Sequence, residues 1–364
     1  MATSSNDMTT RAASYRRTVL VVRFSSLGDV AMAIPVVYAA CAANPDTRFV
    51  FLTKAPVAQL FVNSPQNLVI YGADMKVEYA GATGLIRLFR KLNKQYRFDA
   101  FIDLHDVLRT RIIGMICRLR GISTSRIDKG RMEKKRLTRE KNKKRIQLKT
   151  SIERYADAFA HAGISVDGNF TGIFGTDKAP QSTFADITAP KAAGETWIAI
   201  APFAAHANKI YPLHLMERVV AELSNRHGVK IFLFGGGAKE RETLGAWSQS
   251  HPNVTSMAEK RHGFPKELAL LSHVDVMVSM DSSNMHLASL VGVPVVSIWG
   301  ATHPFCGFAG WNNRSDLRVQ RDDMPCRPCS AFGNKPCRLG DTPCLNGIAP
   351  ETIIEKIDKA LSNG

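Results

Sequence analysis

The chain has 364 residues, of which 45% are apolar and 22% are charged, and its formal net charge is +16. This length fits two ordinary domains, and the composition is that of a globular protein, which excludes a disordered or fibrous chain. The first apolar run stops at Arg23, and no run approaches the roughly 18 apolar residues that span a bilayer, so neither a signal peptide nor a membrane helix is expected. The sequence therefore predicts a cytoplasmic protein.

Strands and helices alternate along the first half of the chain. Residues 1–17 are polar and are expected to form a tail. Thr18–Phe24 is a continuous apolar run, which is typical of a strand buried on both faces of a parallel sheet. Further elements are expected as a helix at Val30–Ala43, strands at Arg48–Leu52 and Phe98–Leu104, and a helix at Ile152–Ala162.

A second alternating run follows residues 176–194, which are rich in glycine, proline and small polar residues and are expected to be a linker. The expected strands are Trp197–Ala201, Val229–Phe234, Val274–Ser279 and Val295–Trp299, and the expected helices are Pro212–His227, Lys239–Ser250, Lys266–His273 and Asn284–Val291. The last helix, Pro350–Leu361, is expected to return across the interface and pack on the N-terminal domain.

Both halves follow a βαβ pattern, which requires parallel sheets. The predicted fold class is therefore α/β, with two facing Rossmann-like domains at residues 18–175 and 195–348 and a C-terminal helix within 349–364. Ligands of such sheets bind beyond the carboxyl ends of the strands, so the sites should lie in the cleft between the domains.

The segment Ser25–Asp29 joins the first strand to the first helix. Gly28 permits a tight turn and a close approach of ligand to backbone, and Asp29 lies where a carboxylate is favoured by the helix dipole. Taken alone, Asp29 is also explained as a helix cap.

Three loops of the second half carry polar groups at strand ends. Lys209 stands before a helix, where a point charge suits a phosphate. Gly236 and neighbouring glycines allow a nucleotide to lie against the backbone, with Glu240 placed to accept from ribose hydroxyls. The last loop begins a helix whose free N–H groups can hold a diphosphate, and its candidate ligands are Asp281, Ser282, Ser283 and His286.

Most of the positive charge lies between residues 109 and 149, which hold sixteen Lys or Arg and three acidic residues. Such a block favours anionic partners, whether nucleic acid, acidic lipid or phosphorylated sugar, although it also fits a solvated helix face. No Phe, Tyr or Trp occurs between Phe101 and Tyr155, so the stacking surfaces used for single-stranded nucleic acid are missing and no nucleic acid is expected.

The order of these segments resembles glycosyltransferase family 9, the heptosyltransferases of lipopolysaccharide assembly, which have the GT-B fold. The resemblance covers residues 18–361. The matching motifs are Ser25–Asp29 with Pro35, Asp103–His105 with Arg109, Lys209–Pro212, Gly236 to Glu240, Asp281–Ala288 and Gly300–Pro304. Together they are specific for the family, although each alone is not.

This resemblance implies an inverting glycosyltransferase that needs no metal for catalysis, with Asp29 deprotonating the acceptor. It assigns the donor diphosphate to Lys209 and the helix at Asp281–His286, and the nucleoside to Glu240. The implied donor is a nucleotide diphosphate sugar, with ADP-heptose favoured. Ser283 and Asn284 stand where the family usually has glycine and a small residue or proline, and this difference bears on donor identity.

The resemblance also implies that the N-terminal half binds a phosphorylated, lipid-linked saccharide, at the inner face of the inner membrane with its anionic surface. The candidate acceptor residues are Ser26, Asp103, His105, Arg109, Arg111, Arg126 and Lys129.

Four of the seven cysteines, Cys326, Cys329, Cys337 and Cys344, lie within nineteen residues. Four thiolates at this spacing are consistent with a structural zinc site, which would leave no coordination position for catalysis. The alternative is four free thiols in a loop.

Three other functions remain open at this point. The chain could be a family member that uses another nucleotide sugar for a different envelope glycan. It could be a non-catalytic RNA- or lipid-binding protein acting through residues 109–149. A nicotinamide dehydrogenase is disfavoured because no Gly-x-Gly-x-x-Gly follows a strand.

Overall fold

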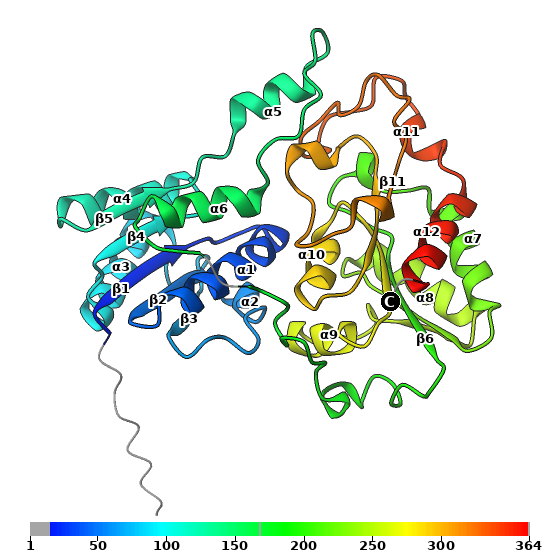
Figure 1. Cartoon of the computed structure of the whole chain (residues 1–364), viewed down its shortest axis with the longest axis horizontal. Helices are drawn as coiled ribbons and strands as arrows, with labels where there is room; N and C mark the ends of the chain where they lie inside the picture. Colours follow the sequence, from blue (N-terminus) through cyan, green and yellow to red (C-terminus); the bar gives the residue numbers. More distant parts are fainter. Residues whose placement is uncertain (1–14, 167–168, 363–364) are drawn as a thin grey trace, which may run out of the picture.

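The computed structural model describes residues 15–166 and 169–362 and shows two α/β domains that face each other (Figure 1). This confirms the predicted pair of Rossmann-like domains. Of the predicted tail, residues 1–14 lie outside the described residues, and β1 begins at Arg17.

The N-terminal sheet has the strand order β3-β2-β1-β4-β5, and every pairing is parallel. Its strands are β1 (Arg17–Val22), β2 (Thr47–Lys54), β3 (Leu68–Ala73), β4 (Ala100–Asp103) and β5 (Ser123–Arg126). Its helices are α1 (Leu27–Ala43), α2 (Ala55–Ala58), α3 (Gly81–Tyr96), α4 (Leu108–Leu119), α5 (Arg131–Thr138) and α6 (Ser151–Ala160). The chain order reverses between β1 and β4, so the loops after these two strands flank the switch point where ligands bind.

Side chains of β1 alternate between two cores. Val19 and Val21 pack with α1 and α6, whereas Leu20 and Val22 pack with α3 and α4. A parallel strand covered on both faces must be apolar throughout, which explains the uninterrupted run that ends at Arg23.

The C-terminal sheet has the order β11-β10-β9-β6-β7-β8 and is also wholly parallel. Its strands are β6 (Thr196–Ala201), β7 (Val229–Leu233), β8 (Val254–Ser256), β9 (Val276–Met280), β10 (Val295–Trp299) and β11 (Arg318–Gln320). Its helices are α7 (Leu213–Ser224), α8 (Ala238–Ser250), α9 (Phe264–Leu271), α10 (Ser283–Leu290), α11 (Pro343–Asn346) and α12 (Pro350–Leu361), with short 3-10 turns at Gln181–Phe184, Ala207–Lys209, Pro304–Cys306 and Ser315–Leu317. Here the order reverses between β6 and β9, which places Lys209 and Asp281 on either side of a second switch point.

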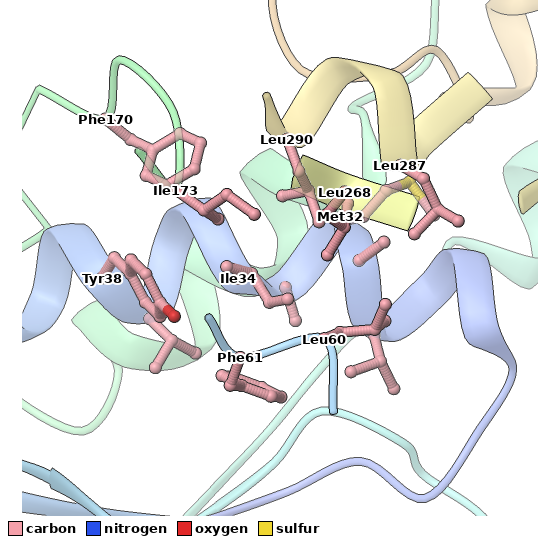
Figure 2. Packing of buried hydrophobic residues seen from close by; sticks show 14 of the residues in the cluster. Met32, Ile34, Tyr38, Leu60, Phe61, Phe170, Ile173, Leu268, Leu287 and Leu290 are labelled. Atoms are coloured by element: carbon pink, nitrogen blue, oxygen red, sulfur yellow. The ribbon is translucent and has the colours of Figure 1, made fainter. Parts of the chain in front are cut away.

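The two domains share one hydrophobic core. Met32 and Ile34 of α1 belong to the same buried cluster as Leu287 and Leu290 of α10 and Leu268 of α9. Figure 2 shows these side chains meeting between the blue helix α1 and the yellow helices of the other domain. This apolar contact brings the N-terminal ends of α1 and α10 together.

The C-terminal helix has the predicted bounds but lies in a different place from the one expected. Ile353, Ile354 and Ile357 are buried in the core of the C-terminal domain, where α12 packs on α7, β9, β10 and β11. The expectation that it returns to the N-terminal domain is therefore wrong. Its apolar face instead covers the face of its own sheet that is turned away from α9 and α10.

The basic segment after β5 crosses from one domain to the other. Lys143 donates to the carbonyls of Cys326 and Pro328 at 2.5 and 2.9 Å, and Arg145 donates to that of Met324 at 2.7 Å. Figure 1 shows α5 and the loop after it rising from the N-terminal domain toward the C-terminal one. At least two of its cations therefore hold the two domains together. Within the described parts of the chain, no helix combines the length and apolar character needed to cross a membrane.

Candidate active site

Asp29 lies in the first turn of α1, where its Oδ2 atom receives three polar contacts. The Arg23 guanidinium is 2.7 Å away, and the hydroxyl and backbone N–H of Ser26 donate at 2.6 and 3.1 Å. None of these contacts uses Oδ1. Asp29 therefore does cap its helix, as its position alone suggested, while one carboxylate oxygen stays available.

The surroundings of Asp29 keep it ionised. Burial raises its pKa, but the charge of Arg23 and the hydrogen bonds from Ser26 outweigh this effect, so the pKa is lowered overall. Arg23 is itself buried, donates to the Leu104 carbonyl and lies over the Tyr155 ring, whose hydroxyl donates to the Asp29 carbonyl. The result is a carboxylate that is charged at neutral pH and fixed in orientation.

A cavity of about 1130 Å³ opens between the domains. Ser26, Gly28 and Asp29 line it from the N-terminal side. All seven residues predicted to bind the donor line it from the C-terminal side: Lys209, Gly236, Glu240, Asp281, Ser282, Ser283 and His286. Asp29 thus shares one cavity with the groups expected to face it.

Lys209 and Asp281 form an ion pair of 3.0 Å in which both side chains are largely buried. The two residues follow β6 and β9, so the switch point of the sheet brings them together. Asp281 therefore fixes the position of the Lys209 ammonium group. Beside this pair, the Ser282 hydroxyl contacts that of Ser279 at 3.2 Å and does not cap α10, so the first N–H groups of α10 keep their capacity for an anion.

Glu240 caps α8 in the structure. Its Oε2 accepts from the N–H groups of Gly236 and Gly237 at 2.7 and 3.3 Å, which caps α8, while Oε1 is not used in these bonds. A Cβ on Gly236 would meet no atom within 4 Å, because this glycine borders open cavity.

His286 is neutral at physiological pH because burial lowers its pKa to about 4. Its Nδ1 is buried and has no hydrogen-bond partner among the described residues. A Cβ on Gly28 would lie 2.8 Å from the His286 Cδ2, so the absence of a side chain at Gly28 lets α1 and α10 meet this closely.

A second cavity of about 640 Å³ adjoins the first and also includes Asp29 and Ser26 in its wall. Seven cationic side chains line it: Arg23, Lys129, Arg131, Lys134, Lys135, the buried Arg154 and Lys335. Tyr155, Phe308 and Phe332 add aromatic surface. This cavity is suited to an anionic ligand that carries apolar or sugar faces.

The predicted acceptor residues divide into two groups. Ser26, His105 and Lys129 line the second cavity, where burial lowers the pKa of His105 to about 4. Asp103, Arg109, Arg111 and Arg126 line neither cavity.

Each of these four side chains is directed elsewhere or exposed. The buried Asp103 carboxylate accepts from the N–H groups of His105 and Asp106 at 2.8 Å and so shapes the turn after β4. Arg111 and Arg126 contact Asp106 at 2.9 and 3.5 Å, and Arg109 is exposed on α4. The sequence pattern placed these residues near the site but could not give their directions.

Asp106 is the acidic centre of the cationic region. Besides Arg111 and Arg126, its carboxylate binds Arg131 at 2.8 Å, and its carbonyl accepts from Lys129 at 3.3 Å. The Asp106 carboxylate thus holds three arginines from separate segments, and its carbonyl holds Lys129. Of these four cations, Arg131 and Lys129 line the second cavity.

The four cysteines of the predicted zinc site differ in burial. No three His, Cys, Asp or Glu side chains within residues 15–166 and 169–362 are gathered so that they could hold a metal ion. Cys344 is buried in the core of the C-terminal domain, where burial raises the pKa of its thiol to about 11, whereas Cys326 is exposed. In the structure all four cysteines are free thiols, and the zinc site stays a prediction.

Several lining residues were not identified from the sequence. Arg23 ends the first apolar run, so its position indicated only a strand end. Nothing in the sequence distinguished Lys134 from the other cations of residues 109–149. Phe308 and Phe332 come from loops of the other domain. The only local signal was the position of Arg23, six residues before Asp29 at a strand end.

Comparison with known proteins identifies the family of this chain. Residues 85–335 match the model of the family described as glycosyltransferase family 9 (heptosyltransferase). The chain is 25% identical to lipopolysaccharide heptosyltransferase 1 of Pseudomonas aeruginosa over 85% of each chain, and 24% identical to lipooligosaccharide heptosyltransferase 2 of Campylobacter jejuni over 92% of this chain and 96% of that one.

Solved structures show the same fold. A glycosyltransferase family 9 protein from Veillonella parvula aligns with a TM-score of 0.74 at 16% identity, covering 96% and 98% of the two chains. The ADP-heptose heptosyltransferase II of E. coli aligns with a TM-score of 0.68 at 17% identity, covering 95% and 99%. The chain therefore belongs to glycosyltransferase family 9, the heptosyltransferases, and is a glycosyltransferase rather than a non-catalytic binding protein or a dehydrogenase.

Proposed function

We propose that this enzyme transfers a heptose from ADP-heptose to an anionic, lipid-linked core saccharide of lipopolysaccharide, with inversion at the anomeric carbon. The observation that carries the proposal is the place of Asp29, whose side chain borders both the 1130 Å³ cavity and the cationic cavity. A base in this position can reach an acceptor hydroxyl on one side while the donor sugar lies on the other.

The reaction is a direct displacement. The acceptor oxygen attacks the anomeric carbon, the bond from that carbon to the diphosphate oxygen breaks, and Asp29 takes the hydroxyl proton. Negative charge then builds up on the leaving nucleotide diphosphate, next to the Lys209 ammonium and the N-terminus of α10. Attack from the face opposite the leaving group inverts the configuration.

The donor fits the larger cavity. Solved structures with the same fold include the E. coli heptosyltransferase WaaC with ADP and with ADP-2-deoxy-2-fluoro heptose, at TM-scores of 0.60 and 0.58. In this chain the Gly235–Gly237 turn with Glu240 would take the ribose, and Ser282 and Ser283 would take the phosphates. Ser283 narrows this subsite, so a different nucleotide sugar is the main alternative.

The acceptor fits the cationic cavity. Lys129, Arg131 and Lys134 converge there with Arg23, and relatives of this chain are named as lipopolysaccharide and lipooligosaccharide heptosyltransferases. Phosphates or carboxylates of such a saccharide would pair with these cations. The lipid part of this acceptor would bring the enzyme to the inner face of the inner membrane.

We further propose that turnover needs no divalent cation, because Lys209 and the α10 N-terminus supply the positive potential that a metal supplies in other transferases. Treatment with a chelator is expected to leave kcat unchanged. A loss of turnover that Mg²⁺ restores would contradict this part of the proposal.

The decisive experiment compares Asp29→Asn with Glu153→Gln. Glu153 is a matched control because it makes the same kind of helix cap, accepting from the N–H and hydroxyl of Thr150 at 2.6 and 2.8 Å, but lies outside both cavities. Asp29→Asn is expected to reduce kcat by about 100-fold or more while ADP-heptose still raises the melting temperature.

The Glu153→Gln variant should keep its turnover. Equal turnover in both variants would show that Asp29 is only a cap. If no ADP-heptose shift is seen but a UDP- or GDP-sugar stabilises the protein, the donor assignment is wrong while the reaction type stands.

A further inference from the structure

Helix α4 has an apolar stripe on its solvent side. Its buried face consists of Thr110, Ile113, Gly114 and Cys117, which pack toward the sheet and α3. On the opposite side, Leu108, Met115 and Leu119 are 76%, 55% and 81% exposed, and Ile112 and Ile116 between them are partly exposed. At about 100° per residue these five side chains form one continuous stripe along the helix.

Arginines border this stripe on both sides. At the same angular spacing, Arg109 and Arg120 fall along one edge, and Arg111 and Arg118 fall along the other. All four are exposed, and no acidic residue occurs between Val107 and Ile127. Stacking of Arg120 over the Phe89 ring and the 3.0 Å bond from Arg118 to Thr124 fix the direction of two of them.

The stripe begins beside the cationic cavity. Leu108 follows Asp106 by two residues, and Asp106 anchors Arg131, which lines that cavity. In Figure 1, α4 lies at the outer side of the N-terminal domain, away from the C-terminal domain. A surface that contacts α4 would therefore meet the enzyme near the end where the acceptor enters.

We propose that α4 is a membrane-docking helix that lies in the plane of an anionic lipid bilayer, with its apolar stripe among the acyl chains and its arginines at the headgroups. Amphipathic helices that bind bilayers combine these two features, an apolar face and flanking basic residues. Arginines along both edges of the stripe match the negative charge of such headgroups. The inference rests on the proposed function in one respect, namely that a lipid-linked acceptor gives the enzyme a reason to bind a membrane.

Vesicle flotation with the full chain tests this inference without any sugar transfer. Vesicles of phosphatidylethanolamine with phosphatidylglycerol are compared with vesicles of phosphatidylcholine alone. The wild-type protein should float with the anionic vesicles and less with the neutral ones, and added salt should weaken binding. Failure to float with anionic vesicles would overturn the inference and leave the catalytic proposal intact.

Paired variants separate the contributions of the apolar stripe and of the arginines to vesicle binding. Met115→Ser with Leu119→Ser should weaken partitioning on the order of tenfold. Arg118→Gln with Arg120→Gln should weaken partitioning onto anionic vesicles about fivefold per charge at low salt. Lysine at both positions keeps the charge and should keep the partitioning. The control is Val77→Ser with Leu339→Ser, since these side chains are 80% and 61% exposed elsewhere on the surface.

Two results would count against a bilayer as the partner. Equal flotation of the α4 variants and the control would remove the helix from the contact. A dimer in sedimentation velocity that the Met115 and Leu119 substitutions dissociate, without any vesicle binding by the wild type, would assign the stripe to a second copy of the chain. Turnover of a water-soluble acceptor fragment should stay unchanged in all α4 variants.

Discussion

Arg23 is the buried cation that sets the protonation state of Asp29. Its guanidinium lies 2.7 Å from Asp29 Oδ2 and opposes the effect of burial on the Asp29 pKa. The base works only as the carboxylate, so its lowered pKa extends activity toward acid pH.

Replacing Arg23 by Gln should therefore raise the Asp29 pKa. The acid limb of the kcat/KM profile is expected to move up by roughly one to three pH units, because burial is no longer opposed by a positive charge. Arg23→Lys keeps the charge and should leave the limb near its original pH. An unmoved limb in both variants, with melting temperatures near wild type, would show that another group limits activity in acid.

Lys134 gives the cationic cavity a pH-sensitive group. Burial lowers the pKa of Lys134 to about 8, with a smaller effect from Arg154, and its ammonium lies over the Phe308 ring. The charged form is present below that pH and is lost above it.

The kcat/KM for an anionic acceptor is accordingly expected to fall as the pH rises through about 8. Lys134→Arg should remove this alkaline decline, because a guanidinium stays charged. The acceptor dependence of initial rates measures both profiles. The same decline in Lys134→Arg would assign it to a different residue.

At the level of elements, the contact between the N-termini of α1 and α10 depends on Gly28. An alanine Cβ there would lie 2.8 Å from His286 Cδ2 and 3.4 Å from Ser283 Cα, so the buried His286 ring or one of the two helices must shift. Gly28→Ala should lower stability by about 1–3 kcal/mol and also weaken donor binding.

The comparison for this variant is Gly236→Ala, whose Cβ meets nothing within 4 Å. It should leave the melting temperature of the free enzyme unchanged and affect only the donor KM. Similar melting temperatures for the two variants would mean that α1 and α10 are packed less tightly than the structure shows.

Elements governed by local sequence were predictable. The bounds of β10 and α12 match the expectation, and α1 begins three residues before the expected Val30 because its capping turn is already helical. Helix α5 was not predicted, since its run of charges has little periodic signal. The direction of α12 could not be known, because its apolar face would suit either domain.

The candidate site was likewise predictable only where local sequence determines it. Strand ends with glycine, lysine or aspartate marked the larger cavity, since the parallel topology carries such loops to one edge. The cationic cavity depends on contacts between distant segments, such as Asp106 with Arg131 and Phe332 from the other domain. No local pattern contains those contacts.

Across the whole molecule, the domains are joined by a shared core. The buried cluster that holds Met32 and Ile34 also holds Leu268, Leu287 and Trp299, so neither domain completes its core alone. Calorimetry is expected to show one cooperative unfolding transition, shifted as a whole by the donor nucleotide. Two transitions, of which the nucleotide shifts one, would show that the domains unfold independently.

The two cavities have part of their walls in common, formed by Ser26 and Asp29 together with Phe308, Ala331 and Phe332. A ligand in one cavity therefore ends within reach of a ligand in the other. A single compound that joins a nucleoside diphosphate to an anionic saccharide through a short spacer past Asp29 would occupy both. The effective concentration created by the link makes such a bisubstrate compound the natural starting point for inhibitor design.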